Sequence, residues 1–203
     1  MAKKATKQNI YTKDVDSDSI VSQLNKKYGE NSLISASKAK GMTVRFFSTG
    51  CYALDFGTGG GIPENRITEI RGPYSSLKST LSLLSAAEFQ RKYEEGIVFF
   101  VDMERTFDPE YTENLGVDLS RIVIVTPDSG EQAGDLVNEV LHYEKPTYVI
   151  LDSIAAMTPT AELEASMEDQ MMGVQARMIN RIMRTAVSAL KRTMYDASLP
   201  SIT

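Results

Sequence analysis

Residues 66–79 read Arg66-Ile67-Thr68-Glu69-Ile70-Arg71-Gly72-Pro73-Tyr74-Ser75-Ser76-Leu77-Lys78-Ser79, and this stretch decides the fold. Apolar residues alternate with polar ones at its start, which predicts a strand over 66–70. Glycine, proline and serines then mark a turn, and a helix is expected from about Lys78 to Tyr93. A strand, a turn ending in lysine and a hydroxyl residue, and a helix are the local context of the phosphate-binding pattern G-x-x-x-x-G-K-S/T.

In such a loop, backbone N–H groups and the helix N-terminus hold phosphate oxygens. Lys78 would add a charge at the β- and γ-phosphates, and the Ser79 hydroxyl would face Mg²⁺. Leu77 stands where the pattern has its second glycine, a position that is usually left-handed. A leucine in that conformation costs ~1–2 kcal/mol, so we expect nucleotide binding to be weakened roughly tenfold and not abolished. The alternative is an ordinary turn between a strand and a helix.

The remainder of the chain alternates strands with helices. The continuous apolar runs over 97–101 and 148–151 indicate strands that are covered on both faces. A further strand is expected over 121–125, and helices are expected over about 109–115 and 129–142. An amphipathic helix is also expected from about Ser17, with Ile20, Val21, Leu24 and Tyr28 on one face. This alternation predicts an α/β fold with a mainly parallel sheet and a site at the carboxyl ends of its strands.

Two acidic residues follow apolar strands and complete a candidate site. Asp152 ends the run over 148–151 and is suited to reach Mg²⁺ through water. Glu104 comes after the strand over 97–101, and a carboxylate there can polarise an attacking water molecule. Each acid taken alone is equally typical of a turn or loop, but the order of loop, acid and acid along the chain favours a site.

Composition excludes several other chemistries. The chain has one cysteine, Cys51, and one histidine, His142, so an internal disulfide, a cysteine metal cluster and most Ser–His–Asp schemes are excluded. No apolar run approaches the ~20 residues of a membrane span. The net charge is −5, so DNA binding would need a local basic patch. We therefore expect an intracellular protein whose chemistry rests on lysine, hydroxyl residues, carboxylates and backbone.

Such a basic patch is present near the C-terminus. Residues 171–195 carry bases and no acids, whereas residues 157–170 carry acids and no bases. On a helix the bases fall within an arc of about 100°, with apolar residues opposite. The bases are Arg177, Arg181, Arg184, Lys191 and Arg192. A row of this kind can follow a nucleic-acid backbone, and a solvated helix face is the alternative.

Taken in order, the motifs of this chain resemble the RecA recombinase family. They are Ser48-Thr49-Gly50, Gly59-Gly60-Gly61-Ile62-Pro63, Gly72-Pro73-x-Ser75-Ser76-x-Lys78-Ser79, Asp102-x-Glu104, Asp108-Pro109-Glu110-Tyr111, Leu115-Gly116-Val117-Asp118, Pro127-Asp128-Ser129-Gly130-Glu131-Gln132 and Asp152-Ser153-x-Ala155-Ala156. The resemblance runs from about residue 20 to 190, and its Leu77-Lys78-Ser79 ending is closer to the phage (UvsX-like) branch. It implies a RecA-type P-loop ATPase core with a mainly parallel sheet flanked by helices, preceded by a short N-terminal helix.

The resemblance implies an enzyme that uses ATP and Mg²⁺, and it suggests a role for each matching residue. Glu104 would activate water, with Lys78 as its catalytic partner, and Ser79 and Asp152 would hold the metal. The nucleotide would be bound by Gly72, Pro73, Tyr74, Ser75, Ser76, Leu77, Lys78, Ser79 and Thr80, with Asp108 and Tyr111 at the adenine. DNA would be contacted by Met172, Gly173, Arg177, Asn180 and Arg184, at the positions of the family's first DNA-binding loop and the helix after it.

The resemblance also implies partners and a domain organisation. The protein would be a DNA-dependent ATPase that forms helical homo-oligomeric filaments on single-stranded DNA, pairs it with homologous duplex DNA and exchanges strands in recombination and repair. It would act in the cytoplasm of a bacterium or of a phage-infected cell, without a membrane partner. We expect a flexible polar tail over 1–16, an N-terminal oligomerisation helix and linker over 17–41, and the ATPase core over 42–203.

Other interpretations remain open. Residues 199–203 resemble the start of another strand, so we expect the C-terminal part of the core to be missing and supplied by a second chain. The alternative is a complete chain whose sheet ends early. Leu77 and the missing part would also suit a non-catalytic RecA-fold assembly or regulatory module that does not turn over ATP. A replicative helicase is less favoured, because residues 127–132 and 157–192 match recombinases better.

Overall fold

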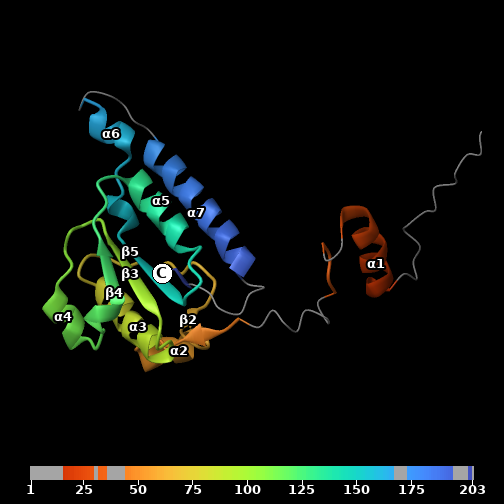
Figure 1. The fold of residues 1–203 in the computed structure, drawn as a ribbon, viewed down its shortest axis with the longest axis horizontal. Coiled ribbons are helices and arrows are strands. Elements are labelled where there is room, and N and C mark those ends of the chain that lie inside the picture. The colour runs from red at the N-terminus through yellow and green to blue at the C-terminus, as the bar shows by residue number, and fades with distance from the viewer. Residues whose placement is uncertain (1–15, 30–31, 36–43, 167–172, 194–200, 203) are drawn as a thin grey trace, which may run out of the picture. The chain divides into compact units, whose positions relative to one another are not determined.

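The computed structural model of the chain describes residues 16–29, 32–35, 44–166, 173–193 and 201–202 (Figure 1). It consists of two compact units, residues 1–44 and residues 45–203. The expected flexible tail, apart from Asp16, and the expected linker around Lys38 lie outside the described residues.

The first unit contains α1 (Ser17–Tyr28), where the sequence predicts a helix. The Asp16 carboxylate accepts a hydrogen bond from the Ser19 N–H at 2.7 Å, which caps the helix, and Gly29 ends it with φ 107°. None of the residues of α1 is buried. The apolar face of this helix is therefore accessible.

A parallel sheet forms the centre of the second unit (Figure 1). Its strands are β3 (Ile97–Asp102), β4 (Ile122–Val125), β5 (Thr147–Asp152) and β6 (Ser201–Ile202), in the order β4-β3-β5-β6. The three apolar runs that predicted strands over 97–101, 121–125 and 148–151 thus form strands. Asp102 lies opposite Asp152 in the register of β3 and β5, so these two strands end level with each other.

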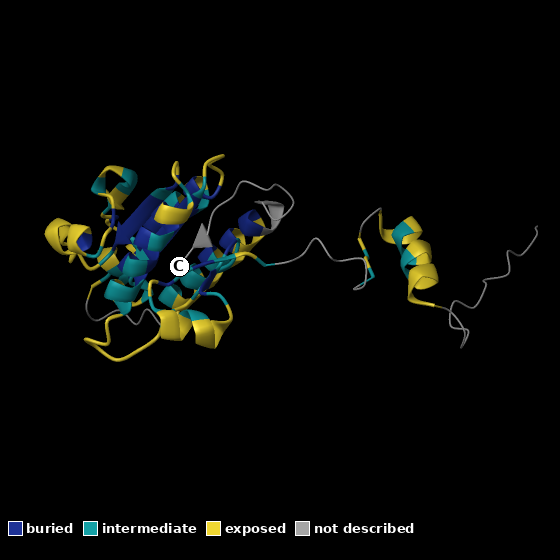
Figure 2. Ribbon diagram, turned by 90° about the horizontal axis from the view of Figure 1, so that it is seen from below, coloured by how far each residue is buried: buried dark blue, intermediate teal, exposed yellow. Residues whose placement is uncertain are grey.

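Helices cover both faces of the sheet, and buried residues fill its centre (Figure 2). Alternate residues of β3 and β5 point to opposite faces. Phe99 and Val149 pack with α5 (Gly130–Val140) and α7 (Val174–Thr193), whereas Val98 and Tyr148 pack with α3 (Lys78–Lys92). This two-sided burial explains why the central strands are apolar along their whole length.

A glycine of α5 allows the close contact between α5 and α7. A Cβ on Gly134 would lie 2.5 Å from Ile182 Cγ1, next to the branch point of that side chain. A larger residue there would therefore require Ile182 or the helices to shift. A Cβ on Gly130 would also lie close to α7, but its nearest atom is the end of the flexible Met178 side chain, which can move away at little cost.

The remaining elements are short and surround this core. They are β1 (Phe46–Phe47) and β2 (Ile62–Pro63), which pair antiparallel, α2 (Tyr52–Thr58), α4 (Pro109–Asn114), α6 (Thr160–Glu164), and 3-10 turns at Leu119–Arg121 and Ile154–Ala156. Helices thus form over 78–92, 109–114 and 130–140, close to the predicted bounds.

The strand predicted over 66–70 is wrong. In this segment only Ile67 forms an isolated bridge, and no ladder of successive partners runs along it among the described residues. The apolar signal has another cause, because Ile67 is half-buried and packs against the core beneath α5 and α7. The alternation of apolar and polar residues over 66–70 therefore arises because alternate side chains are buried, although the backbone does not form the hydrogen bonds of a strand.

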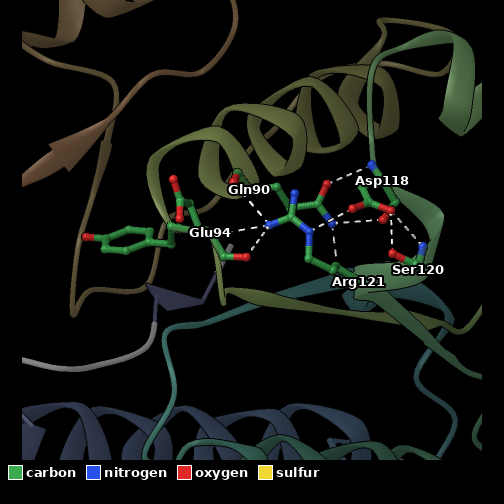
Figure 3. A network of polar contacts seen from close by, with 6 residues as sticks. Gln90, Glu94, Asp118, Ser120 and Arg121 are labelled. Atoms are coloured by element: carbon green, nitrogen blue, oxygen red, sulfur yellow. Dashed lines mark hydrogen bonds and ion pairs between the residues drawn. The ribbon is translucent and has the colours of Figure 1, made fainter.

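A network of hydrogen bonds joins the C-terminal end of α3 to the segment that leads into β4 (Figure 3). The Gln90 amide accepts from the Asp118 N–H at 2.8 Å and donates to the carbonyls of Asp118 and Arg121. The Arg121 guanidinium donates to the carbonyls of Gln90, Tyr93 and Glu94 at 3.1–3.2 Å. These carbonyls lie at a helix end and have no partner within the helix, so the arginine satisfies them.

Candidate nucleotide site and the adjoining basic helix

The loop Gly72–Leu77 leads directly into the N-terminus of α3. Leu77 is left-handed, with φ 63° and ψ 27°, as the sequence predicts for this position. Its side chain is 68% exposed and does not fill the loop. A Cβ on Gly72 would lie 2.5 Å from Ser76 Oγ, the end of a short side chain that can rotate away. The feature that the loop shares with a phosphate cradle is therefore the left-handed residue directly before the helix.

The N-terminus of α3 and Lys78 supply the positive groups of this loop. Leu77 provides no capping side chain, so the first N–H groups of this 15-residue helix have no side-chain acceptor at the N-cap. The Lys78 ammonium donates to the Gly72 carbonyl at 3.1 Å and to the Pro73 carbonyl at 2.8 Å. Uncapped N–H groups, a helix dipole and a lysine together form an environment that suits phosphate oxygens.

The structure brings the two predicted acids together at the carboxyl ends of β3 and β5. The Met103 N–H donates to the Asp152 carbonyl at 2.8 Å, which holds the chain after β3 beside the end of β5. The Ser153 hydroxyl, next to Asp152, donates to Glu104 Oε1 at 2.6 Å. Glu104 is exposed, so its carboxylate is both oriented and reachable by water.

The loop that carries Glu104 is held by Asp102, whose role the sequence interpretation missed. Asp102 is 2% exposed, and its carboxylate accepts from the Thr106 N–H at 3.1 Å and the Phe107 N–H at 2.9 Å. An aspartate at the end of a buried strand, followed by a short loop, is the signal that indicates such a bond. Asp102 therefore shapes the loop from within.

Asp108 and Tyr111, the two residues predicted to contact adenine, have different local contacts in the structure. The Tyr111 hydroxyl lies 2.9 Å from the Thr80 hydroxyl, so Tyr111 reaches the first turn of α3 beside the phosphate loop. Asp108 caps α4 instead, because its carboxylate accepts from the Tyr111 N–H at 3.0 Å. That bond fixes the position of Tyr111, and contact of either residue with adenine stays a prediction.

The residues present fit a nucleotide with Mg²⁺. The uncapped N-terminus of α3, with the Lys78 ammonium beside it, offers the kind of donors that phosphate oxygens accept from. Ser79 follows Lys78 in the first turn of α3, and Asp152 ends β5. Hydroxyl and carboxylate oxygens are ligands that Mg²⁺ accepts when phosphates and water supply the others. Within the described residues, no group of three His, Cys, Asp or Glu side chains forms a metal site.

The basic face predicted for 171–195 lies on α7. Arg177, Asn180, Arg181 and Arg184 are exposed, and Ile182, Ala186 and Leu190 are buried on the opposite face. In the described part of the chain, no ion pair joins these arginines to a carboxylate. Gly173 precedes the helix with φ 75°. Met172 and the side chains of Lys191 and Arg192 lie outside the described residues.

None of the helices in the described ranges is long and apolar enough to span a membrane.

Comparison with known proteins identifies relatives of this chain. The sequence model of the RecA N-terminal domain matches residues 16–198. Protein RecA of Mesomycoplasma hyopneumoniae is 38% identical over 173 residues, which cover 85% of this chain and 51% of the relative. Protein RecA of Chlorobium chlorochromatii is 42% identical over 175 residues, covering 85% of this chain and 49% of the relative. The chain thus spans about half the length of these curated relatives. With the family domain matched along most of its length and with such relatives, the chain belongs to the RecA family.

Proposed function

We propose that this chain is the ATPase core of a DNA recombinase that hydrolyses ATP with Mg²⁺ and forms filaments on single-stranded DNA. The observation that carries the proposal is the uncapped N-terminus of α3, which follows the left-handed Leu77 and has the Lys78 ammonium held against the turn before it. Glu104, oriented by Ser153 at the end of β5, supports the same activity. Family membership supports the same activity, since the relatives are named Protein RecA.

In this proposal each group has one task. Lys78 and the N–H groups of α3 hold the β- and γ-phosphates. Ser79 and Asp152 hold Mg²⁺, which neutralises charge on the phosphates when bound. Glu104 accepts a hydrogen bond from water and orients it for attack, while Ser153 holds the carboxylate in place. Tyr111 and Asp108 contact adenine.

We further propose the partners of the core. Arg177, Asn180 and Arg184 of α7, with Gly173 and Met172 ahead of them, contact single-stranded DNA, and homologous duplex DNA is then paired for strand exchange. The accessible apolar face of α1 suits docking on a neighbouring copy in a helical filament. The phage-type branch and a location in the cytoplasm of a bacterium or infected cell belong to the same proposal.

The test is ATP binding and hydrolysis by the purified chain, with and without single-stranded DNA. Lys78→Ala should weaken binding of a fluorescent ATP analogue by roughly tenfold or more, because it removes a charge-assisted contact to phosphate. Lys145→Ala is the matched control, since Lys145 is an exposed lysine in the turn before β5.

A non-catalytic assembly module is the second candidate, and it is motivated by leucine at the position where the phosphate-loop pattern has glycine. The same experiment separates the two. Self-association and DNA binding that survive Lys78→Ala, in a chain whose wild type does not hydrolyse ATP, would support the assembly module and contradict the ATPase.

A further inference from the structure

The short segment between β5 and α6 contacts both proposed sites. At its start, the Ser153 hydroxyl donates to Glu104 at 2.6 Å. Farther along, the Gln175 side-chain amide donates to the Ala155 carbonyl at 3.2 Å and to the Met157 carbonyl at 2.9 Å. Gln175 lies in the first turn of α7, the helix with the exposed arginines. One segment of five residues therefore touches the water-orienting carboxylate and the proposed DNA-binding helix.

Packing also joins this segment to α7. Met157 is 1% exposed and belongs to the same core as Ile182 and Leu190 of α7. The amide of Gln175 has two donor hydrogens, and both are used on carbonyls of this segment. Two hydrogen bonds and a shared core therefore connect the first turn of α7 to the segment that begins at Ser153.

We propose that Gln175 is a positioning residue that couples DNA binding on α7 to the nucleotide site. The inference rests on the proposed function. Gln175 stands two positions before Arg177, and Ala155 stands two positions after Ser153. DNA that fixes α7 through Arg177 fixes the orientation of Glu104 through Gln175 and Ser153. The coupling is reciprocal, so bound nucleotide must raise the affinity for DNA by the same factor.

The experiment measures this factor without depending on hydrolysis. Fluorescence anisotropy gives the affinity of the full chain for a labelled oligo-dT, with and without Mg²⁺ and a non-hydrolysable ATP analogue. In the wild type the analogue should raise DNA affinity roughly fivefold or more. Gln175→Met keeps the length of the side chain but removes its donors, and it should bring the factor close to one. The two separate affinities should stay near wild-type values.

Controls separate coupling from folding and from the proposed function. Gln175→Ala repeats the test if the methionine variant folds poorly, and Ser188→Ala, at an exposed position of the same helix, should behave as the wild type. The inference would be overturned if the ATP analogue raised DNA affinity as much in the Gln175 variants as in the wild type. It would also be overturned if these variants lost affinity for DNA and for the analogue equally. A wild type that binds DNA and the analogue, but whose DNA affinity the analogue does not change, overturns the inference and leaves the proposed function standing. A wild type that binds neither overturns the proposed function with it.

Discussion

The strain of the left-handed Leu77 can reduce either the affinity for nucleotide or the stability of the fold. The tenfold loss of nucleotide affinity expected from the sequence applies if Leu77 becomes left-handed only when nucleotide binds. The structure has Leu77 in that conformation, at φ 63°. We therefore expect the ~1–2 kcal/mol of strain to lower the free energy of unfolding, with little effect on nucleotide affinity.

Leu77→Gly should accordingly stabilise the fold and leave binding almost unchanged. Relief of strain, less the extra freedom that glycine gives the unfolded chain, should raise the free energy of unfolding by about 0.5–1 kcal/mol. Urea denaturation measures this, and calorimetric titration with an ATP analogue measures affinity. Leu77→Ala is the control, because it keeps a Cβ in the left-handed conformation. A tenfold gain in affinity for Leu77→Gly would contradict the assignment of strain to folding.

Glu64 is, with Asp102, a buried acidic residue of the second unit. It is 4% exposed, and its carboxylate accepts from the Tyr93 hydroxyl at 2.6 Å and lies 2.9 Å from Arg45 Nε, with Lys92 as a third partner. Burial opposes its ionisation, but the hydrogen bonds from Lys92 and Tyr93 and the nearby charges outweigh burial and hold the pKa of Glu64 below its ordinary value. Burial and the same carboxylate raise the pKa of Tyr93.

Glu64→Gln should lower the free energy of unfolding by about 2–3 kcal/mol at pH 7, because the amide at this buried position loses the charge-assisted hydrogen bonds that the carboxylate accepts from Lys92 and Tyr93. A lowered pKa stabilises the folded state above the ordinary carboxyl value, and this stability is lost as the pH falls through the lowered value. The gap between wild type and variant should therefore shrink on acidification below about pH 4.5. Urea denaturation across this range checks it, and a gap that grows with acid would refute the assignment.

At the scale of elements, α3 ties together parts of the chain that are distant in sequence. Gln90 of its last turn donates to the Arg121 carbonyl at the entry to β4, and the Arg121 guanidinium donates back to the Gln90 carbonyl. Lys92 and Tyr93 reach Glu64 beside β2. The first turn of the same helix carries Lys78, so these contacts at its far end help to fix the position of the proposed phosphate loop. One helix thus contributes both to the stability of the fold and to the proposed nucleotide site.

The helix pair α5–α7 should be intolerant of added volume. Gly134→Ala places a methyl group against Ile182, and the free energy of unfolding should fall by about 1–2 kcal/mol despite the better helix propensity of alanine. Gly57→Ala in α2 is the matched control, because nothing lies within 4 Å of its Cβ, and it should gain up to about 1 kcal/mol. Thermal or urea unfolding measures both. Equal gains in both variants would show that the helices are free to separate.

At the scale of the whole molecule, charge is segregated. The chain carries a net charge of −5, yet exposed arginines of α7 form one basic face. Overall repulsion from DNA must then be overcome locally, so binding should be steeply dependent on salt. Arg184→Gln should reduce the slope of log affinity against log salt by about 0.7. Lys145→Gln, a charge loss elsewhere, should leave the slope unchanged, and an unchanged slope in Arg184→Gln would exclude it as a phosphate contact.

The sequence predicted most of the elements because their periodicity is strong. The apolar runs of β3 and β5 and the two-sided character of α7 follow from side-chain pattern alone. The strand over 66–70 was wrong, since packing of Ile67 produces the same pattern.

Contacts such as Ser153 to Glu104 and Gln175 to Met157 could not be predicted. They join residues far apart in sequence, and they depend on side-chain direction. Catalytic and binding roles stay predictions that the experiments above test.

The two hydrogen bonds from Lys78 to the carbonyls of Gly72 and Pro73 have an energetic consequence for the proposed site. A phosphate group that takes the ammonium as its partner has to replace two carbonyl oxygens of the protein's own turn. Part of the gain from the new contact therefore offsets the loss of these internal bonds, so the net contribution of the lysine to affinity should be smaller than that of a lysine without internal partners.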